Sequence, residues 1–206
     1  KVNLFLFFCF IAPIVLVISL NSVIYNGWRH LFFIYPFLIL ISVFSINYLL
    51  VNFKKNKSRV LIKVFLLLII SLNVFNVYKF HPFQNVYFNS LIEKNANKYF
   101  VIDYWGISNF AMLDKILEIN SNNNQIDIGV KSFTDLSYNA HLLSKNDFKI
   151  MNFTGTDGID PDFIVSNYYY EGNPKYLKKY NMPDNYEKIY SLKKGNIIIN
   201  DLFIKK

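Results

Sequence analysis

Residues 31–59 read LFFIYPFLILISVFSINYLLVNFKKNKSR: a run of 23 uncharged, mostly apolar residues is followed by four positive charges in six residues. About 20 apolar residues in an α-helix are enough to cross the hydrocarbon core of a bilayer. Lysine and arginine collect in the short loops on the cytoplasmic side of membrane proteins. The stretch therefore predicts a transmembrane helix over residues 31–53 and a cytoplasmic loop over residues 54–59.

Two further apolar runs flank this stretch, at residues 2–24 and 60–78. Each is long enough to span a bilayer as a helix. Lys63, the one charged residue in the third run, lies near its end, where a lysine side chain can reach the interface. We therefore predict three transmembrane helices within residues 1–78.

The charged residues are divided unevenly along the chain. Residues 1–92 contain eight basic residues and no acid, whereas residues 93–206 contain 14 acids and 14 lysines, so the net charge of +8 comes from the apolar half. A nucleic-acid-binding domain needs a basic face on its folded soluble part, and no nucleic-acid partner is expected. The single cysteine, Cys9, lies in an apolar run, which argues against a disulfide framework or a cysteine-based metal site.

The predicted topology puts two stretches in the same compartment. Counting spans from the basic loop, the turn YNGWRH (residues 25–30) and everything after residue 78 lie on the extracytoplasmic side. The first residue is Lys1 rather than methionine. We therefore expect the chain to be a fragment of a longer polypeptide whose upstream part is missing.

The sequence changes character after residue 78. Residues 79–98 are expected to form a juxtamembrane connector, and residues 99–206 a small, soluble, extracytoplasmic α/β domain. Alternating strand and helix patterns that end in a hairpin indicate this fold class. The expected strands cover residues 99–104, 126–130, 148–152 and 162–167, the helices 108–119 and 136–143, and the hairpin 187–192 and 196–204 around Lys193-Lys194-Gly195.

Residues 108–119 (SNFAMLDKILEI) carry the clearest helical pattern. Ser108 is the expected N-cap, because serine readily accepts a hydrogen bond from the first turn. The spacing predicts one apolar face and one charged face. The apolar face holds Phe110, Leu113 and Ile116 or Leu117, and the charged face holds Asp114, Lys115 and Glu118.

The turn YNGWRH has two interpretations. It can be an interfacial turn, with tyrosine and tryptophan in the aromatic belt and Arg29 and His30 at the lipid headgroups. Alternatively, Arg29 binds a phosphate at the membrane surface, since its guanidinium presents a rigid fork of donors that suits phosphate oxygens. His30 would then add a hydrogen bond or move a proton.

Two more stretches carry candidate site residues. HPFQNVYFN (residues 81–89) contains His81 and Gln84, and is either a connector with interfacial aromatics or part of a site. DYWG (residues 103–106) contains Asp103 and Trp105 at an expected strand-to-helix junction. It is either a buried aromatic corner that uses glycine for its turn or a functional site at a strand end.

No further motif points to a cofactor or a metal. TGTDGIDPD (residues 154–162) has the composition of a solvated turn rather than of a calcium loop. The sequence has no glycine-rich nucleotide motif, no serine-hydrolase elbow and no zinc-ligand spacing. We expect neither a cofactor nor a metal site.

Three stretches taken together resemble a known family. YNGWRHLFFIYP (25–36), HPFQNVYFN (81–89) and DYWGIS (103–108), in this order and spacing, are similar to the C-terminal part of bacterial membrane glycosyltransferases related to the dolichyl-phosphate-mannose protein mannosyltransferases, the family 39-like group. The resemblance covers residues 20–110. It implies the GT-C architecture and transfer of a sugar from a polyprenyl-phosphate carrier to an acceptor on the outer face of the bacterial inner membrane.

The resemblance also implies partners and site residues. The expected partners are a lipid-linked phosphosugar donor and membrane lipids. The residues expected to bind substrate are Arg29, His30, His81, Gln84, Asp103 and Trp105. The family places its catalytic acidic residue in an early outer loop, where it acts as a base, but no residue before Glu93 is acidic in this chain. A general base must lie within hydrogen-bond reach of the acceptor hydroxyl, so this chain is expected to lack the catalytic acid.

A non-enzymatic function is the alternative. The α/β domain can be a membrane-tethered binding domain that recognises a polysaccharide or a partner protein. In that case YNGWRH is an ordinary interfacial turn.

Overall fold

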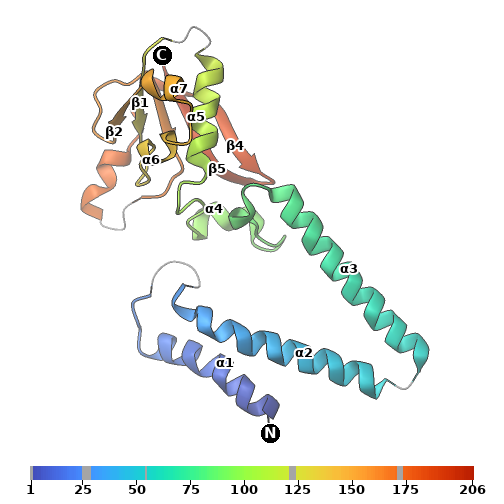
Figure 1. Cartoon of the computed structure of the whole chain (residues 1–206). Helices are drawn as coiled ribbons and strands as arrows, with labels where there is room; N and C mark the ends of the chain where they lie inside the picture. The colour runs from blue at the N-terminus through green and yellow to red at the C-terminus, as the bar shows by residue number, and fades with distance from the viewer. Residues whose placement is uncertain (1, 25–28, 54, 121–123, 171–173) are drawn as a thin grey trace. The chain divides into compact units, whose positions relative to one another are not determined.

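The computed structural model describes residues 2–24, 29–53, 55–120, 124–170 and 174–206, with the backbone alone at 174–176 (Figure 1). The chain divides into two units. The N-terminal unit covers residues Lys1–Phe75, and the sheet unit covers Asn76–Lys206.

The N-terminal unit is built from long apolar helices. They are α1 (Val2–Ser19), the 3-10 helix η1 (Arg29–Ile34), α2 (Tyr35–Asn52) and α3 (Asn56–Phe80), which continues into the sheet unit. α1 and α2 pack against each other, and η1 contacts both. Three segments, Val2–Ser19, Arg29–Asn52 and Asn56–Phe80, are long and apolar enough to cross a membrane. This confirms the three predicted apolar helices and is consistent with an integral membrane protein.

Polar groups in these helices are satisfied locally. Ser42 and Asn73 donate to the carbonyls of Leu38 and Ile69, each four residues earlier, at 2.9 and 2.8 Å. Pro36 lies in the first turn of α2, where a missing N–H removes no helical hydrogen bond. Backbone and side-chain polar groups in lipid must find partners within the protein, and Ser42 and Asn73 find theirs within about one turn.

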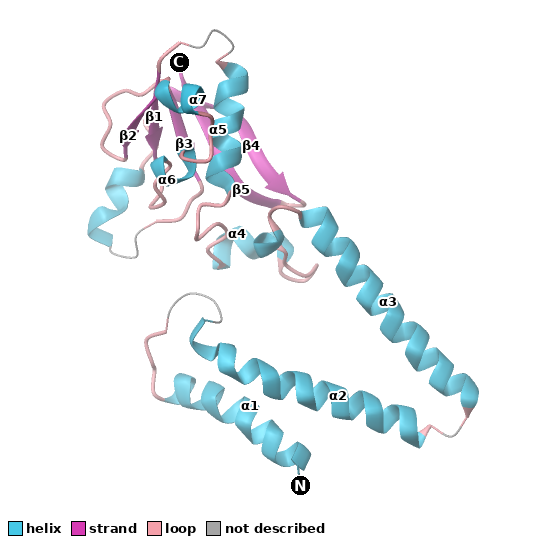
Figure 2. Ribbon diagram, in the orientation of Figure 1, coloured by secondary structure: helices cyan, strands magenta, loops and turns pink. Residues whose placement is uncertain are grey.

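The sheet unit contains a mixed five-stranded sheet in the order β2-β1-β3-β5-β4 (Figure 2). The strands are β1 (Ile126–Val130), β2 (Met151–Gly155), β3 (Phe163–Ser166), β4 (Tyr186–Lys194) and β5 (Ile197–Lys205). β1 runs parallel to β2 and β3, and β5 pairs antiparallel with β3 and β4. The predicted α/β domain, with its closing hairpin, is therefore confirmed.

Helix α5 (Ser108–Ile119) covers one face of this sheet together with α6 (Ser137–Ala140) (Figure 1). Met112, Leu113 and Ile116 of α5 are fully buried. They pack against apolar side chains that the strands present to the same face, namely Ile126, Ile128, Val130, Met151, Phe163, Val165 and Leu202. This burial is the main source of stability in the unit.

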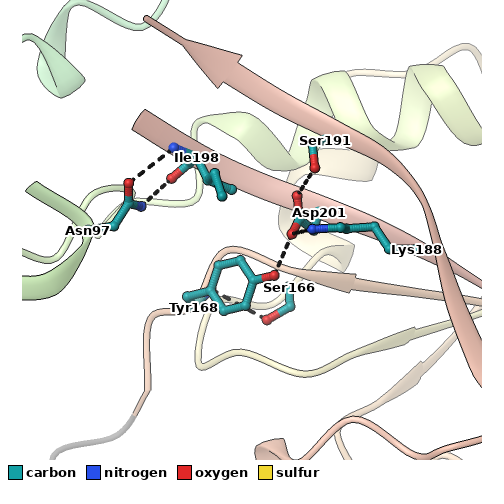
Figure 3. A network of polar contacts seen from close by, with 7 residues as sticks. All are labelled: Asn97, Ser166, Tyr168, Lys188, Ser191, Ile198 and Asp201. Atoms are coloured by element: carbon teal, nitrogen blue, oxygen red, sulfur yellow. Dashed lines mark hydrogen bonds and ion pairs between the residues drawn. The ribbon is translucent and has the colours of Figure 1, made fainter. Parts of the chain in front are cut away.

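A second, smaller core joins the end of α3 to β5. Short helices η2 (Gln84–Val86), η3 (Glu93–Asn95) and α4 (Ala96–Tyr99) follow α3. Phe80, Phe83, Val86, Ala96 and Ile102 pack with Ile197 and Ile199 of β5. Asn97 also donates to the carbonyl of Ile198 at 2.6 Å and accepts from its N–H at 3.1 Å (Figure 3). Residues 79–98 are thus packed onto the sheet.

The strand predicted at residues 99–104 is absent. α4 ends at Tyr99, and residues 100–107 form turns and irregular backbone. Ile102 and Asp103 are both buried, so the inside–outside alternation of a half-buried strand fails here. The segment bends because the Asp103 carboxylate reaches the first N–H groups of α5.

The predicted bounds of α5 are confirmed, but two details are wrong. Ser108 is not the N-cap; it is the first helical residue, and its hydroxyl donates to Asp103. Phe110 is exposed, and Met112 takes the buried position beside Leu113 and Ile116. Asn109 is buried as well, so the inward face of α5 begins with polar residues that its apolar spacing did not predict.

The region between β1 and β3 differs from prediction in its boundaries. The helix expected at 136–143 is reduced to α6, and Phe148 lies in the short helix α7 (Lys145–Lys149), so that β2 begins only at Met151. Ser144 caps α7: its hydroxyl accepts from Asp147 N and donates to the Asp147 carboxylate. Serine followed three residues later by an acid is a helix-start signal that the apolar pattern concealed. A further 3-10 helix, η4 (Pro174–Tyr180), follows β3.

Candidate functional site

Asp103 anchors the turn that precedes α5. Its side chain is fully buried, and its carboxylate accepts from Ile107 N at 2.8 Å, from Ser108 N at 3.0 Å and from the Ser108 hydroxyl. The first N–H groups of a helix lack intrahelical partners and favour a negative charge. Asp103 therefore positions its neighbours, and its carboxylate does not face solvent.

The same turn presents Trp105 to solvent. Gly106 has φ +65°, and a Cβ there would lie 2.7 Å from the Asn109 amide, so glycine is required. Gly106 N donates to the Asp103 carbonyl at 3.2 Å and closes the turn. The Trp105 ring packs edge-on against Tyr104, with 5.0 Å between the centroids.

Trp105 lies at an open cleft of about 350 Å³ in the sheet unit. We call it the aromatic cleft. It is lined by Tyr104, Trp105, Phe133, Thr134, Asp135, Tyr138, Asn139 and Tyr169. Ring contacts continue from Tyr104 to Tyr169 at 5.0 Å and from Tyr169 to Phe133 at 5.5 Å.

The cleft is placed by two parallel strands. Phe133 comes three residues after β1, and Tyr169 comes three residues after β3. Phe133 N donates to the Tyr169 carbonyl at 2.7 Å and ties the two loops together. Ligands of open α/β sheets bind outside the carboxyl ends of the parallel strands, and the aromatic cleft occupies this position on β1 and β3.

Hydrogen bonds from neighbouring residues hold the polar side chains of the cleft in place. Asn167, nearly fully buried, donates to the Thr134 hydroxyl at 2.9 Å and to the Asp103 carbonyl at 3.0 Å. Asn109 donates to the Asn139 side-chain oxygen at 3.3 Å. Ser137 N donates to the Asp135 carboxylate at 2.9 Å. Among the described residues that line the cleft, none is basic and Asp135 alone carries a charge.

His81 and Gln84 form a separate pair. Gln84 Nε2 lies 2.8 Å from His81 Nδ1, and because the amide nitrogen can only donate, His81 Nδ1 accepts. Lys194, in the β4–β5 hairpin, donates to the His81 carbonyl at 3.0 Å and to the Lys79 carbonyl at 3.4 Å. HPFQNVYFN is therefore a turn fastened to the sheet at the end of α3.

Arg29 and His30 belong to the N-terminal unit. They are the first two residues of η1, and both are exposed. The rest of YNGWRH, residues 25–28, lies outside the described residues. Arg29 and His30 are thus neighbours on one element, while the other four predicted site residues belong to the sheet unit.

A buried polar network on β5 was missed by sequence reasoning. The fully buried Asp201 carboxylate accepts from the hydroxyls of Tyr168 and Ser191 and from Lys188 Nζ at 3.1 Å (Figure 3). Burial, with Asp201 as a further cause, raises the pKa of the Tyr168 hydroxyl, so this hydroxyl remains a donor at neutral pH. The signal was the pair Asn200-Asp201 inside the apolar run IIINDLFI, since polar residues in a central strand need partners.

A smaller cavity of about 160 Å³ is lined by Lys131, three glycines and the 156–161 loop, among others. Lys131 Nζ donates to the Thr156 carbonyl at 2.8 Å and to the Lys179 carbonyl at 3.1 Å. Burial lowers the pKa of this amine. The two carbonyls hold Lys131 in place, which makes it a structural link between loops.

No metal site is evident in the part of the chain that the structure describes, because no group of three or more His, Cys, Asp or Glu residues is arranged to hold an ion. Comparison with known proteins gives no match either: no family model, no curated protein and no solved structure matches the chain.

Proposed function

We propose that this chain is the C-terminal portion of a polytopic glycosyltransferase that moves a sugar from a polyprenyl-phosphate carrier to an acceptor on the outer face of the bacterial inner membrane. The three apolar helices and the three family-like stretches support this proposal. The α/β domain would then lie on the extracytoplasmic side.

The observation that carries the proposal is the position of Arg29 and His30. Both are exposed at the start of η1, directly before α2. α2 has 18 residues, which span about 27 Å at 1.5 Å per residue. The basic loop begins at its other end, where Arg59 caps α2 by donating to the Phe53 carbonyl at 2.8 Å. Arg29 with its neighbour His30 and a basic segment therefore flank one bilayer-length helix.

This arrangement suits an anionic lipid carrier. An arginine guanidinium is a permanent cation whose planar fork can bind two phosphate oxygens. In the transfer step the acceptor oxygen bonds to the anomeric carbon, the bond from that carbon to the phosphate oxygen breaks, and polyprenyl phosphate leaves. The acceptor proton passes to a base; a carboxylate base would come from outside residues 1–92, because they contain no Asp or Glu.

The test is sugar transfer in membranes by the full-length protein with Arg29→Ala, Arg29→Lys or Lys57→Ala. Loss of a charge-assisted, bidentate contact predicts at least a roughly tenfold loss of transfer for Arg29→Ala. Arg29→Lys should recover part of it, because lysine keeps the charge and loses the fork. Lys57→Ala is the matched control, since Lys57 is an exposed cation in the first turn of α3, within the basic segment 54–59. If a normally inserted Arg29→Ala protein transfers sugar at the wild-type rate, the assignment of Arg29 to the carrier phosphate is refuted.

A second candidate is a membrane-tethered domain that binds a polysaccharide without acting on it. The observation that favours it is the aromatic cleft, which offers stacking surfaces and neutral polar groups. It predicts saccharide binding by a full-length protein that shows no transfer with any lipid-linked donor.

A further inference from the structure

We propose that the aromatic cleft is a saccharide-binding subsite, and that its occupant is a neutral glycan. This glycan would be the acceptor of the transfer reaction, and that assignment rests on the proposed function. The binding itself depends only on the cleft.

The exposed rings of the cleft are the first reason. Tyr138 is 78% exposed, Trp105 67% and Phe133 51%. Large apolar side chains gathered on the surface of a soluble domain mark an interaction site. Aromatic faces carry partial negative charge, so they attract the weakly positive C–H groups on the apolar faces of sugar rings.

The polar groups of the cleft are the second reason. A sugar also presents hydroxyl groups, which need donors and acceptors at its edges. Thr134, Asp135 and Asn139 supply a hydroxyl, a carboxylate and an amide beside the rings. Asn109 engages the Asn139 oxygen, and within the described parts of the chain the Asn139 NH₂ group has no partner, so two donors remain for a ligand.

The charge of the cleft argues against other occupants. A nucleotide or a lipid phosphate is usually bound by arginine, lysine or a helix N-terminus. The described lining residues include no arginine and no lysine, and Asp103 already occupies the N-terminus of α5. A surface that lies on an anionic membrane is also rich in lysine and arginine.

The construction of the cleft is the third reason. Its residues come from the turn before α5, from the loops after β1 and β3, and from α6. Buried Asn167 and Asn109 fix Thr134 and Asn139, so the polar groups are held before a ligand arrives. Preorganisation reduces the entropic cost of binding. About 350 Å³ falls at the lower end of small-molecule sites.

The experiment uses the full chain in nanodiscs. The chain has two tryptophans, Trp28 and Trp105, so Trp28→Phe leaves Trp105 as the only indole. This protein is titrated with chitotetraose, cellotetraose and maltotetraose while tryptophan fluorescence is recorded. We expect a saturable spectral shift with at least one of the three, because a sugar that stacks on Trp105 removes water from the ring.

Calorimetric titration of variants identifies the surface. We expect Trp105→Ala and Tyr138→Ala to weaken binding at least tenfold, Trp105→Phe to weaken it less, and Tyr99→Ala to leave it unchanged. Tyr99 is the matched control, since it is 66% exposed and lies outside the cleft. Thermal unfolding checks that each variant is folded.

Three outcomes overturn the proposal. The first is the absence of a saturable response to any of the three saccharides. The second is equal binding by wild type and by Trp105→Ala and Tyr138→Ala. The third is quenching of Trp105 by brominated lipids without any response to saccharide. The last outcome assigns the rings to a membrane surface. Arg29→Ala separates this proposal from the transferase: it should bind saccharide normally while transfer is lost. Binding without transfer in wild type keeps the cleft and removes the transferase.

Discussion

In the apolar helices, Ser42 and Asn73 donate to carbonyls four residues earlier, whereas in the sheet unit Tyr168 donates to Asp201 across 33 residues and Asn167 donates to Asp103 across 64. Helices that cross a membrane must satisfy their own polar groups, because lipid offers no partner. The sheet unit uses its buried polar groups to join distant segments. Replacing a polar side chain that takes part in these bonds should therefore be costly in the sheet unit and tolerated in the helices.

Burial follows the same division. Of the described residues in the N-terminal unit, only Leu6 and Ile34 are buried, whereas α5 alone buries Met112, Leu113 and Ile116. A helix that is apolar all round and buries almost nothing is matched to lipid rather than to a protein core. The stability of the first unit thus depends on its solvent, and that of the second on its own contacts.

The largest effect is expected at Asp201. Asp201→Ala leaves Lys188, Tyr168 and Ser191 without their shared acceptor. Removing one partner of a buried charged network costs about 2–4 kcal/mol of unfolding free energy, and the exposed Lys188 ammonium moderates the loss. Denaturant unfolding followed by near-UV circular dichroism measures it. Asp114→Ala, on the exposed face of α5, is the control and should change stability by less than about 0.5 kcal/mol; equal losses would contradict the contrast.

An intermediate effect is expected at Gly106, the turn of the aromatic cleft. Gly106→Ala forces alanine to φ +65° and puts its Cβ 2.7 Å from the Asn109 amide. We expect a loss of about 2–3 kcal/mol from backbone strain and the clash. Gly155→Ala is the matched control, because Gly155 has φ +69° and nothing within 4 Å of the added carbon. It should lose about 1 kcal/mol. Similar melting temperatures for the two variants would mean that the turn at Gly106 adjusts to the added carbon, and that Asn109 does not hold the turn in place.

The smallest effect is expected in the apolar helices. Ser42→Ala removes a hydroxyl whose hydrogen bond, among the described residues, goes to the carbonyl of Leu38 in its own helix. The backbone bond of that carbonyl remains, so we expect a change below about 0.5 kcal/mol in unfolding by sodium dodecyl sulfate, monitored by far-UV circular dichroism. A loss above about 1 kcal/mol would show that Ser42 contacts another helix or a partner, and that the helices are not independent of polar packing.

Part of the candidate site could be predicted from the sequence. DYWG drew attention to Asp103 and Trp105 at an expected strand-to-helix junction; Trp105 lines the aromatic cleft, and Asp103 does not. Phe133, Tyr138 and Tyr169 were missed, since a chain with 15 tyrosines and 21 phenylalanines offers no way to choose among them. The role of Asp103 could not be predicted from the sequence either. Its burial and its bond from Ile107 N show that the carboxylate binds the N-terminus of α5.

The sequence by itself determined the three apolar helices, the bounds of α5, and the strands β1, β3, β4 and β5 to within a few residues, because hydrophobic runs and periodicity are local properties. The tertiary structure decided the strand order, the absence of a strand at residues 99–104, and the meeting of Trp105 with Tyr169 at one cleft. These features depend on contacts between residues tens of positions apart, and no local pattern encodes which distant partner a side chain will meet.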